Sequence, residues 1–361
     1  MSAPTAVPLP TTIEDLDAPW LTAVLRADGV IGSDVAVRAV RAERIALDTG
    51  FSSELHRLSL DGDPGVPASV VAKLPTGTVV RQAMDMVGGY AREVAFYRDV
   101  AGRAPLRTPR AHAARIAEDS SDFVLVLEDL GDWRVGNHFE GLSLADARRC
   151  VAELAGLHAW SVTPDAAATV SAFPSLDSPA ARQAFPALFA EGWAVYRQRA
   201  RQAVPPAVAA FGDRISEHVP RLLEGLTERP GLIHGDIRAD NLFFRGDDLA
   251  IVDFQLTARG VGAADVAYLV SQGLTTETRG GGDERLVREY LELLAGHGAP
   301  AYAFEDAWRH YRMGVAFFLL FPVIAIRGYE GLPDQARELC LRLCERSIAT
   351  ITDVDALEVL A

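Results

Sequence analysis

The chain has 361 residues, of which 49% are hydrophobic and 23% charged, a composition typical of globular proteins. This length is enough for at least one large hydrophobic core and favours two domains. The formal net charge of −14 and the isoelectric point of about 5.0 argue against nucleic acid as the main partner, because neutralising phosphates requires a basic surface.

The N-terminal segment MSAPTAVPLPTT has neither a basic start nor an apolar run, so we expect no signal peptide and a cytoplasmic protein. Cys150, Cys340 and Cys344 are an odd number of cysteines in a long chain, which favours a reducing compartment over a disulfide framework. The longest apolar stretch, residues 313–326, is shorter than the roughly 20 residues that span a bilayer, and Pro322 interrupts it. We interpret this stretch as a buried helix and expect no membrane partner.

Residues 11–27 predict an amphipathic helix that opens with a capping box between Thr11 and Glu14. From about residue 36 the pattern changes to strands joined by Gly-, Asp- and Pro-rich turns, and ASVVAKLP, residues 68–75, is one of these strands. The segment MDMVGGYAREVAFYRDVA returns to helical spacing, and FVLVLEDLGD is a short apolar run that ends in acids and a glycine, as a strand leaving a sheet does. Residues 1–128 therefore predict a β-rich N-terminal lobe.

The rest of the chain, residues 129–361, has a mostly helical pattern. Ser143 and Asp146 fit an N-terminal cap for the helix LSLADARRCVAELAGLHAW. The exception is a predicted hairpin, NLFFRGDDLAIVDF, with residues 245–248 as its turn. A β-rich lobe followed by a helical lobe predicts an α+β, bilobal fold, and clefts between such lobes are favoured places for small-molecule sites.

Lys73 is the only lysine among the 35 lysines and arginines, which leaves 34 arginines. Codon usage that drifts towards arginine explains the missing lysines but not the one that remains. Lysine carries a compact ammonium and arginine a broad planar fork, so a site that holds one small cation between two anionic groups can exclude arginine. On its own segment, Lys73 is as well explained by an ordinary surface lysine as by a functional one.

The most informative stretch is LIHGDIRADNLFFRGDDLAIVDFQ, residues 232–255. Its hairpin is expected to bring Asn241 and Asp253 towards one point, and an amide oxygen beside a carboxylate is suited to Mg²⁺. Asp236 precedes Asn241 on the same loop and is free to face a hydroxyl group. The stretch therefore predicts Asn241 and Asp253 as metal ligands, and its resemblance to the kinase fold implies Asp236 as the catalytic residue.

This spacing resembles the catalytic loop and metal-binding segment of the kinase fold, and its His-Gly-Asp resembles small-molecule kinases, where protein kinases usually have His-Arg-Asp. The resemblance implies a lysine on an N-lobe strand that grips the nucleotide phosphates, and VVAKLP matches this strand with Lys73. It also implies a glutamate on the next helix that pairs with the lysine, and Glu93 matches that position. A lysine held among phosphates and a carboxylate would explain why Lys73 is not an arginine.

Two further segments match the nucleotide-binding parts that the resemblance implies. LDTGFSSELHRL lies where a loop over the phosphates is expected, although it lacks the full Gly-x-Gly-x-x-Gly pattern and an ordinary hairpin turn explains it equally well. The donors expected from this loop are Gly50, Ser52 and Ser53. LVLEDLGD resembles the hinge between lobes, with a plain core strand as the alternative. At the hinge, adenine is expected to meet the backbone of Glu128, Asp129 and Leu130.

The chain resembles the aminoglycoside phosphotransferase-like kinase superfamily, and within it the ecdysteroid-kinase-like or choline-kinase-like branch. The resemblance rests on Asp253-Phe254-Gln255 in place of Asp-Phe-Gly, on FVLVLEDLGDWRVGN and on LAGLHAWSV, and it extends over about residues 12–350. It implies a nucleotide-binding lobe at residues 1–128, and a helical lobe at residues 129–361 that holds the catalytic loop and the acceptor site. It implies ATP and Mg²⁺ as cofactors and phosphoryl transfer to a hydroxyl group of a small molecule. Gln255 departs from the protein-kinase pattern, so a flipping activation segment is less expected.

Three interpretations of the function remain open from the sequence. The ecdysteroid-like branch points to a lipophilic alcohol as acceptor, which we prefer, and the acidic C-terminal lobe also fits an amine-bearing acceptor such as an aminoglycoside. A nucleotide-binding pseudokinase is the third, but the complete set of Lys73, Glu93, Asp236, Asn241 and Asp253 argues against it. The His-Gly-Asp loop argues against a protein kinase. We expect a monomer or a homodimer.

Other residues are expected to have structural roles. Asp265 is predicted to cap the helix GAADVAYLVSQG, His234 to brace the predicted catalytic loop, and His138 and His158 to be structural or surface residues. The acceptor pocket is expected from residues 131–230 and from the C-terminal helices, including AWRHYRMGVAFFLLF. The aromatic candidates for it, which are more often core residues at helical spacing, are Trp133, Trp160, Trp193, Trp308 and Tyr311.

Overall fold

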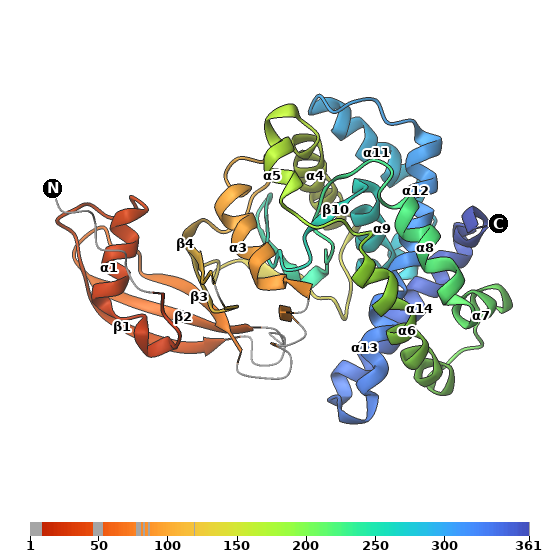
Figure 1. Cartoon of the computed structure of the whole chain (residues 1–361), viewed down its shortest axis with the longest axis horizontal. Helices are drawn as coiled ribbons and strands as arrows, with labels where there is room; N and C mark the ends of the chain where they lie inside the picture. The colour runs from red at the N-terminus through yellow and green to blue at the C-terminus, as the bar shows by residue number, and fades with distance from the viewer. Residues whose placement is uncertain are drawn as a thin grey trace. The chain divides into compact units, whose positions relative to one another are not determined.

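The computed structural model describes residues 9–45, 53–76, 81, 84–85, 87–118 and 120–360. Two compact units divide the chain (Figure 1). Unit 1 comprises residues 1–103, 107–133 and 252–256, and unit 2 comprises residues 104–106, 134–251 and 257–361. Asp253 therefore belongs to unit 1, whereas Asp236 and Asn241 belong to unit 2.

Unit 1 is built on a five-stranded antiparallel sheet with the strand order β1-β2-β3-β5-β4. Its described elements are η1 (Ile13–Asp15), α1 (Ala18–Ala27), β1 (Val37–Ile45), β2 (Ser53–Gly62), β3 (Ser69–Pro75), α3 (Gly89–Asp99), β4 (Ala111–Ile116) and β5 (Phe123–Glu128). The interior strands β3 and β5 are apolar runs because neighbours cover both of their faces. Among the described residues, the predicted β-rich region thus forms a sheet on which α1 and α3 pack.

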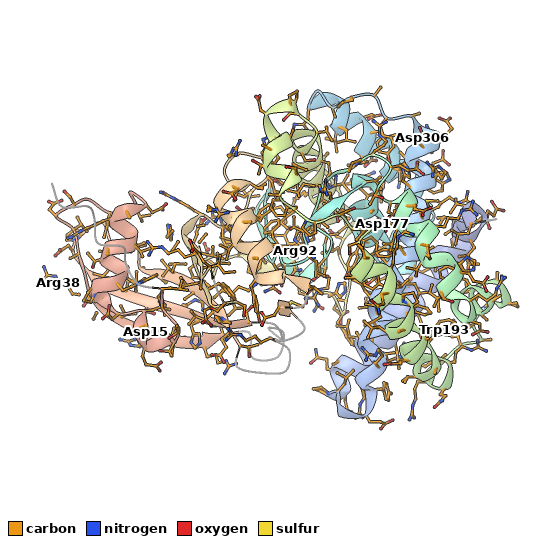
Figure 2. The ribbon with its side chains drawn as sticks, viewed as in Figure 1. Asp15, Arg38, Arg92, Asp177, Trp193 and Asp306 are labelled. Atoms are coloured by element: carbon orange, nitrogen blue, oxygen red, sulfur yellow. The ribbon has the colours of Figure 1, made fainter. Side chains whose placement is uncertain are left out.

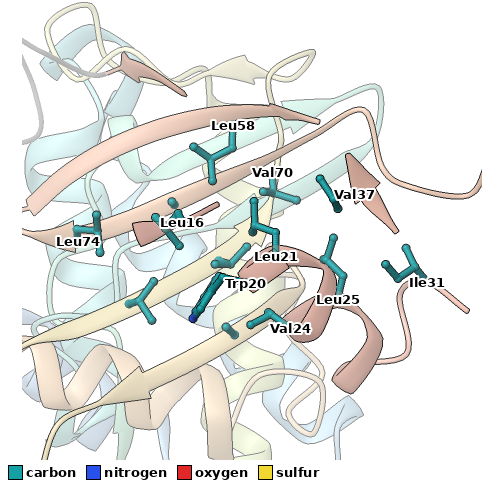
Figure 3. Packing of buried hydrophobic residues seen from close by; sticks show 14 residues of the cluster. Leu16, Trp20, Leu21, Val24, Leu25, Ile31, Val37, Leu58, Val70 and Leu74 are labelled. Atoms are coloured by element: carbon teal, nitrogen blue, oxygen red, sulfur yellow. The ribbon is translucent and has the colours of Figure 1, made fainter. Parts of the chain in front are cut away.

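The hydrophobic core of unit 1 lies between α1 and one face of the sheet (Figure 3). Trp20, Leu21 and Val24 of α1 belong to the same buried cluster as Val70, Ala72 and Leu74 of β3. Side chains alternate between the two faces of a strand. Lys73 therefore points to the face of the sheet opposite α1.

The first predicted helix begins later than the sequence pattern indicates. A short 3-10 turn precedes it, in which the Asp15 carboxylate accepts the backbone N–H groups of Thr11 and Thr12. The helix itself starts at Ala18, capped by Asp17, whose side chain accepts the N–H of Trp20 at 2.8 Å. The prediction of a helix from residue 11 was wrong because Pro19, which has no N–H, fits only the first turn of a helix.

Unit 2 is mainly helical. Its elements are β6 (Arg134–Val135), α4 (Leu144–Ser161), η2 (Pro164–Ala166), α5 (Ala167–Ser171), α6 (Pro179–Arg199), α7 (Pro206–Asp213), α8 (Ile215–Gly225), β7 (Gly231–Ile233), η3 (Ala239–Asn241), β8 (Leu242–Arg245), β9 (Asp248–Ile251), β10 (Ala258–Gly260), α9 (Gly262–Gly273), α10 (Thr276–Arg279), α11 (Asp283–Gly296), α12 (Phe304–Phe318), α13 (Leu320–Ala325), η4 (Ile326–Gly331), α14 (Asp334–Asp353) and η5 (Ala356–Leu360). The predicted cap of α4 is confirmed, since the Ser143 side chain accepts the Asp146 N–H. A sheet unit and a helical unit make the fold α+β, as predicted.

The predicted hairpin is confirmed as β8 and β9, which pair antiparallel and join through Gly246 and Asp247. Gly246 has a φ of +57°, which a glycine adopts without strain at the first central position of a tight hairpin turn. Leu242 pairs with Ile251 at the open end of the hairpin. The register therefore leaves Asn241 one residue before this pair and Asp253 two residues after it.

The predicted apolar helix over residues 313–326 is two helices, α12 and α13, that meet at Leu319. Pro322 has no N–H to donate to the carbonyl of Phe318, and the side chain of Gln272 donates to that carbonyl instead, at 2.7 Å. By length and composition alone, the continuous helical stretch Phe304–Gly331 could cross a membrane, but 61% of its most apolar window is buried inside the unit. A core helix passes the same test, and this burial supports that interpretation.

Candidate active site

Lys73 lies in the middle of β3 and contacts two carboxylates of unit 1. Its Nζ is 2.8 Å from Oε1 of Glu93 on α3 and 3.2 Å from Oδ1 of Asp253. The side chains of Lys73 and Glu93 are 7% and 1% exposed, so the ammonium is enclosed between the two acids. The structure thus brings together three residues that the sequence separates by up to 180 positions.

The charged groups in this cluster shift each other's pKa values. Burial alone would lower the pKa of Lys73, but the carboxylates of Asp253 and Glu93 outweigh burial and raise it. Burial raises the pKa of Glu93 to about 7, with Lys73 opposing the shift and Asp253 adding to it. Lys73 therefore carries its charge over the whole physiological range of pH, whereas Glu93 titrates near neutrality.

The segment Asp253-Phe254-Gln255 is anchored within unit 1. Asp253 has a φ of +68°, a conformation that non-glycine residues adopt at a cost and that clusters at functional sites. Phe254 is fully buried and stacks on Phe96 of α3, with 3.5 Å between the ring centroids. Gln255, where protein kinases have glycine, donates from Nε2 to the Ser53 hydroxyl at 3.0 Å. These contacts hold Asp253 at Lys73.

The predicted catalytic loop follows β7 in unit 2, and Asp265 of α9 holds it. The buried Asp265 carboxylate accepts the backbone N–H groups of His234 at 2.6 Å and Gly235 at 2.9 Å, and it lies 3.2 Å from Nε2 of His158. Burial would raise the pKa of Asp265, but these hydrogen bonds and the His158 ring lower it, so the carboxylate is ionised.

The prediction that Asp265 caps its helix was wrong. Asp265 is the fourth residue of α9, too far into the helix to accept the first N–H groups, and it serves the loop instead. His158 is confirmed as a buried structural residue, and His234 as a brace, because its Nδ1 accepts the N–H of Asp236 at 3.1 Å.

Asp236 contacts a tyrosine and an arginine within unit 2. Its Oδ1 accepts the hydroxyl of Tyr268 at 2.9 Å, and its Oδ2 lies 3.3 Å from Nε of Arg238. Burial and the nearby Asp236 carboxylate raise the pKa of Tyr268 well above its usual value, so Tyr268 remains a donor. Sequence reasoning missed Tyr268; its position three residues after Asp265, one helical turn along α9, was the available signal.

Asn241 ends η3 and is 5% exposed. Its Nδ2 donates to the backbone carbonyl of Asp236 at 2.9 Å, so its Oδ1 points away from that carbonyl. No described residue donates to Oδ1 of Asn241. The described residues contain no group of three or more His, Cys, Asp or Glu side chains that could hold a metal. An amide oxygen and one carboxylate are nevertheless the kind of donor set that Mg²⁺ uses when phosphates and waters complete its shell.

The predicted hinge residues lie at the end of β5. The Glu128 side chain pairs with Arg107 at 2.8 Å, and the Asp129 side chain pairs with Arg57 at 2.8 Å. The N–H of Glu128 donates to Arg110, and the carbonyl of Leu130 accepts from Trp133. Leu130 is 5% exposed, and no described residue accepts its backbone N–H, which leaves this donor for a ligand.

The expected loop over the phosphates is only partly within the described residues. Gly50 and Ser52 lie outside them. Ser53 begins β2, is 3% exposed, and uses its hydroxyl to accept from Gln255.

A cluster of aromatic side chains adjoins Asp236 through Tyr268. We call it the aromatic cluster, and it consists of Phe185 of α6, Tyr268 of α9, Phe317 and Phe318 of α12, and Phe321 of α13. The ring centroid of Tyr268 lies 4.6 Å from that of Phe318 and 5.6 Å from that of Phe321, and Phe185 lies 6.4 Å from Phe321. Phe185 and Phe321 are half-buried, so the cluster keeps an accessible apolar surface.

The aromatic candidates named from the sequence pack elsewhere. The indole of Trp193 on α6 (Figure 2) donates to Asp213 at 2.9 Å, and Trp308 stacks on Tyr311, whose hydroxyl donates to Asp283. Trp133 belongs to unit 1, beneath the guanidinium of Arg107. Trp160 is a half-buried residue near the end of α4. The AFFLLF part of the expected segment supplies three members of the aromatic cluster, Phe317, Phe318 and Phe321.

Comparison with known protein families gives one match, the model described as "Phosphotransferase enzyme family", over residues 68–308. The chain belongs to this family. It is therefore a phosphotransferase with an alcohol group as acceptor, as the sequence predicts. The match covers β3 with Lys73, the predicted catalytic loop and the Asp253 segment.

Solved structures of small-molecule kinases share the fold of this phosphotransferase. Choline kinase from Cryptosporidium parvum Iowa II has a TM-score of 0.57 and 12% identity over 93% of this chain and 97% of its own. Aminoglycoside 2′-phosphotransferase-IIIa in its GDP complex has a TM-score of 0.52 and 16% identity, with 91% and 98% covered. Spectinomycin phosphotransferase in complex with ADP and spectinomycin has a TM-score of 0.50 and 13% identity, with 95% and 99% covered. A comparison with curated proteins gives no match. At these identities the likeness shows the kinase-like fold and leaves the acceptor open.

Proposed function

We propose that this phosphotransferase transfers the γ-phosphoryl group of ATP, with Mg²⁺, to a hydroxyl group of a small lipophilic alcohol. The enclosed pair of Lys73 and Glu93, with Asp253 on the same ammonium, is the observation that carries the nucleotide part of the proposal. Phosphoryl transfer depends mainly on the positioning of the reactants and on the stabilisation of charge. A buried cation beside a carboxylate whose pKa is about 7 is suited to binding a polyphosphate.

In this mechanism Lys73, held by Glu93, contacts the nucleotide phosphates. The N–H of Leu130, which no described residue accepts, lies in the predicted segment Glu128 to Leu130 and donates to the adenine. Asn241 and Asp253 each offer an oxygen to Mg²⁺, which supplies neutralisation of the phosphate charge when it is bound.

Asp236 orients the acceptor hydroxyl and accepts its proton. The hydrogen bond from Tyr268 fixes one carboxylate oxygen, and Asp265 holds the backbone on which Asp236 is carried. The result is a carboxylate with a defined direction at the point where a hydroxyl must lose its proton. We further propose that the protein works in the cytoplasm as a monomer or a homodimer; the three cysteines, all free and buried, are compatible with a reducing compartment.

The aromatic cluster supports a lipophilic acceptor. Phe321 and Phe185 present apolar surface next to the Tyr268–Asp236 pair. An apolar alcohol gains burial against these phenylalanine rings, whereas a polycationic amino sugar would lose the hydration of its charges there.

The test compares two acceptor classes in the wild type and in the Phe321→Ala variant. We expect lipophilic alcohols to stimulate release of ADP from Mg·ATP and amino sugars such as kanamycin not to do so. Phe321→Ala is expected to raise KM for the alcohol about tenfold or more, because truncating a half-buried ring removes roughly 1.5–3 kcal/mol of apolar contact. KM for ATP stays unchanged, and Phe304→Ala, at the other end of α12, serves as the matched control. Stimulation by amino sugars alone would contradict the assignment of the acceptor.

A further inference from the structure

A separate cavity of about 300 Å³ lies within unit 2, among α4, β7, α9, α11 and the segment before α12. Its floor includes the buried His158, Tyr290 and Leu294 and the half-buried Gly262, and its rim includes the exposed Arg229 and the half-buried Tyr302. This volume is at the lower end of small-molecule pockets. The residues proposed for nucleotide, metal and proton transfer do not line it, so it is a second site.

The charged group on the rim of the cavity is the guanidinium of Arg229. Arg229 donates to the backbone carbonyl of Ala301 at 2.9 Å, and its guanidinium lies 4.7 Å from the ring centroid of Tyr302. No carboxylate of the described residues forms an ion pair with it. A guanidinium that is fixed by a carbonyl and an aromatic ring, but not neutralised, is a ready partner for one anionic group.

The remaining walls are apolar. Val162, Pro230 and Leu294 line the cavity, and Val162 is 41% exposed, one of the few large apolar side chains that unit 2 leaves open to water. An occupant thus needs an apolar body as well as its charge. A dianion such as inorganic phosphate would place a second, unmatched charge against these walls, which is costly.

A chain of hydrogen bonds connects the floor of the cavity to the loop that carries Asp236. The hydroxyl of Tyr290 lies 2.9 Å from Nδ1 of His158, and Nε2 of His158 lies 3.2 Å from the Asp265 carboxylate, which accepts the N–H groups of His234 and Gly235. Gly262 makes this packing tight, because a Cβ there would lie 2.1 Å from the Tyr290 hydroxyl and 2.4 Å from the His158 ring. An occupant that restrains Tyr290 therefore restrains the loop.

We propose that this cavity is an effector site for a small monocarboxylate with an apolar or aromatic body. Its carboxylate pairs with Arg229, its body packs on Leu294 and Tyr290, and its binding stiffens the His158–Asp265 brace of the loop.

Binding to the full chain is the first test, with benzoate as the probe and the uncharged benzamide as its match. We expect benzoate to bind and to raise the melting temperature, and benzamide to bind at least tenfold more weakly. Arg229→Gln and Leu294→Trp are expected to weaken benzoate binding at least tenfold, the first by removing the charge and the second by filling the cavity. Arg285→Gln, an exposed arginine on α11 away from the cavity, is the matched control and keeps the affinity.

Hydrogen exchange tests the connection to the loop. Saturating benzoate is expected to slow exchange of the His234 and Gly235 amides several-fold in the wild type and not in Arg229→Gln. The proposed site would be overturned if benzoate binds no better than benzamide or binds Arg229→Gln as well as the wild type. Displacement of benzoate by Mg·ADP would also overturn it. Binding without a change in amide exchange would overturn the effector role. None of these measurements uses turnover, so their failure is distinct from failure of the proposed function.

Discussion

Replacing Lys73 by arginine keeps the charge and changes only the shape of the cation. The ammonium lies 2.8 Å from one carboxylate and 3.2 Å from another, in a side chain that is 7% exposed. A planar guanidinium cannot occupy the same point between Glu93 and Asp253, so it must move by about 1 Å, and a misplacement of this size costs about 10²-fold in rate. This loss corresponds to about 2.7 kcal/mol of activation free energy.

The enlarged side chain also has a cost in stability. Overpacking a buried site costs about 1–3 kcal/mol, which we expect as a fall of a few degrees in the melting temperature, without loss of the folded state. The assay is kcat/KM for ATP together with the melting temperature. Arg41→Lys, on the exposed surface of β1, makes the reverse exchange away from the cluster and is expected to change neither quantity. A Lys73→Arg enzyme as active and as stable as the parent would refute the assignment of Lys73 to the phosphates.

Three other predictions concern ionised groups. Glu93, whose pKa rises from 4.5 to about 7 on folding, binds a proton in the folded chain that the unfolded chain releases, so it lowers the free energy of unfolding by about 3 kcal/mol as pH rises from 4.5 to 7. Urea unfolding across this range should show that slope in the wild type and lose it in Glu93→Gln; equal slopes would contradict the raised pKa. Asp236→Asn is expected to keep Mg·ATP affinity and lower kcat by 10²- to 10⁴-fold, and near-normal kcat would show that the proton leaves by another route. In Asp265→Asn, an amide replaces the carboxylate towards which three N–H groups point, and we expect a loss of about 1–3 kcal/mol of stability and faster exchange of the His234 amide. Unchanged exchange would remove Asp265 from the support of the loop.

The chemistry-bearing residues could be predicted because each stands in a short motif with a fixed local geometry. Lys73 is a lone lysine within an apolar strand, and the hairpin between Asn241 and Asp253 is specified by a two-residue turn with glycine. The pairing of Lys73 with Glu93 could also be predicted, because the resemblance to the kinase fold implies a glutamate on the helix that follows the lysine strand. These contacts depend on local structure and on a resemblance that covers most of the chain.

Tertiary contacts were less accessible to sequence reasoning. Asp265 has the spacing of a helix cap, and only the packing of α9 on β7 shows that its carboxylate accepts the loop N–H groups. Tyr268 and Phe321 look like ordinary core aromatics, since nothing in a helical pattern tells which ring lies next to Asp236. The start of α1 at Ala18 depends on the competition between the Thr12 turn and Pro19, which periodicity does not weigh.

Transfer of labelled phosphate measures the central claim most directly. The protein is mixed with Mg²⁺, ATP labelled at the γ-phosphate and a panel of lipophilic alcohols, and the products are identified by mass spectrometry. We predict that label moves to the hydroxyl oxygen of at least one alcohol, and that the Asp236→Asn variant, with its Mg·ATP affinity intact, transfers at least 10²-fold less. Label found only in inorganic phosphate or only in amino sugars, or equal transfer by Asp236→Asn, would contradict the account.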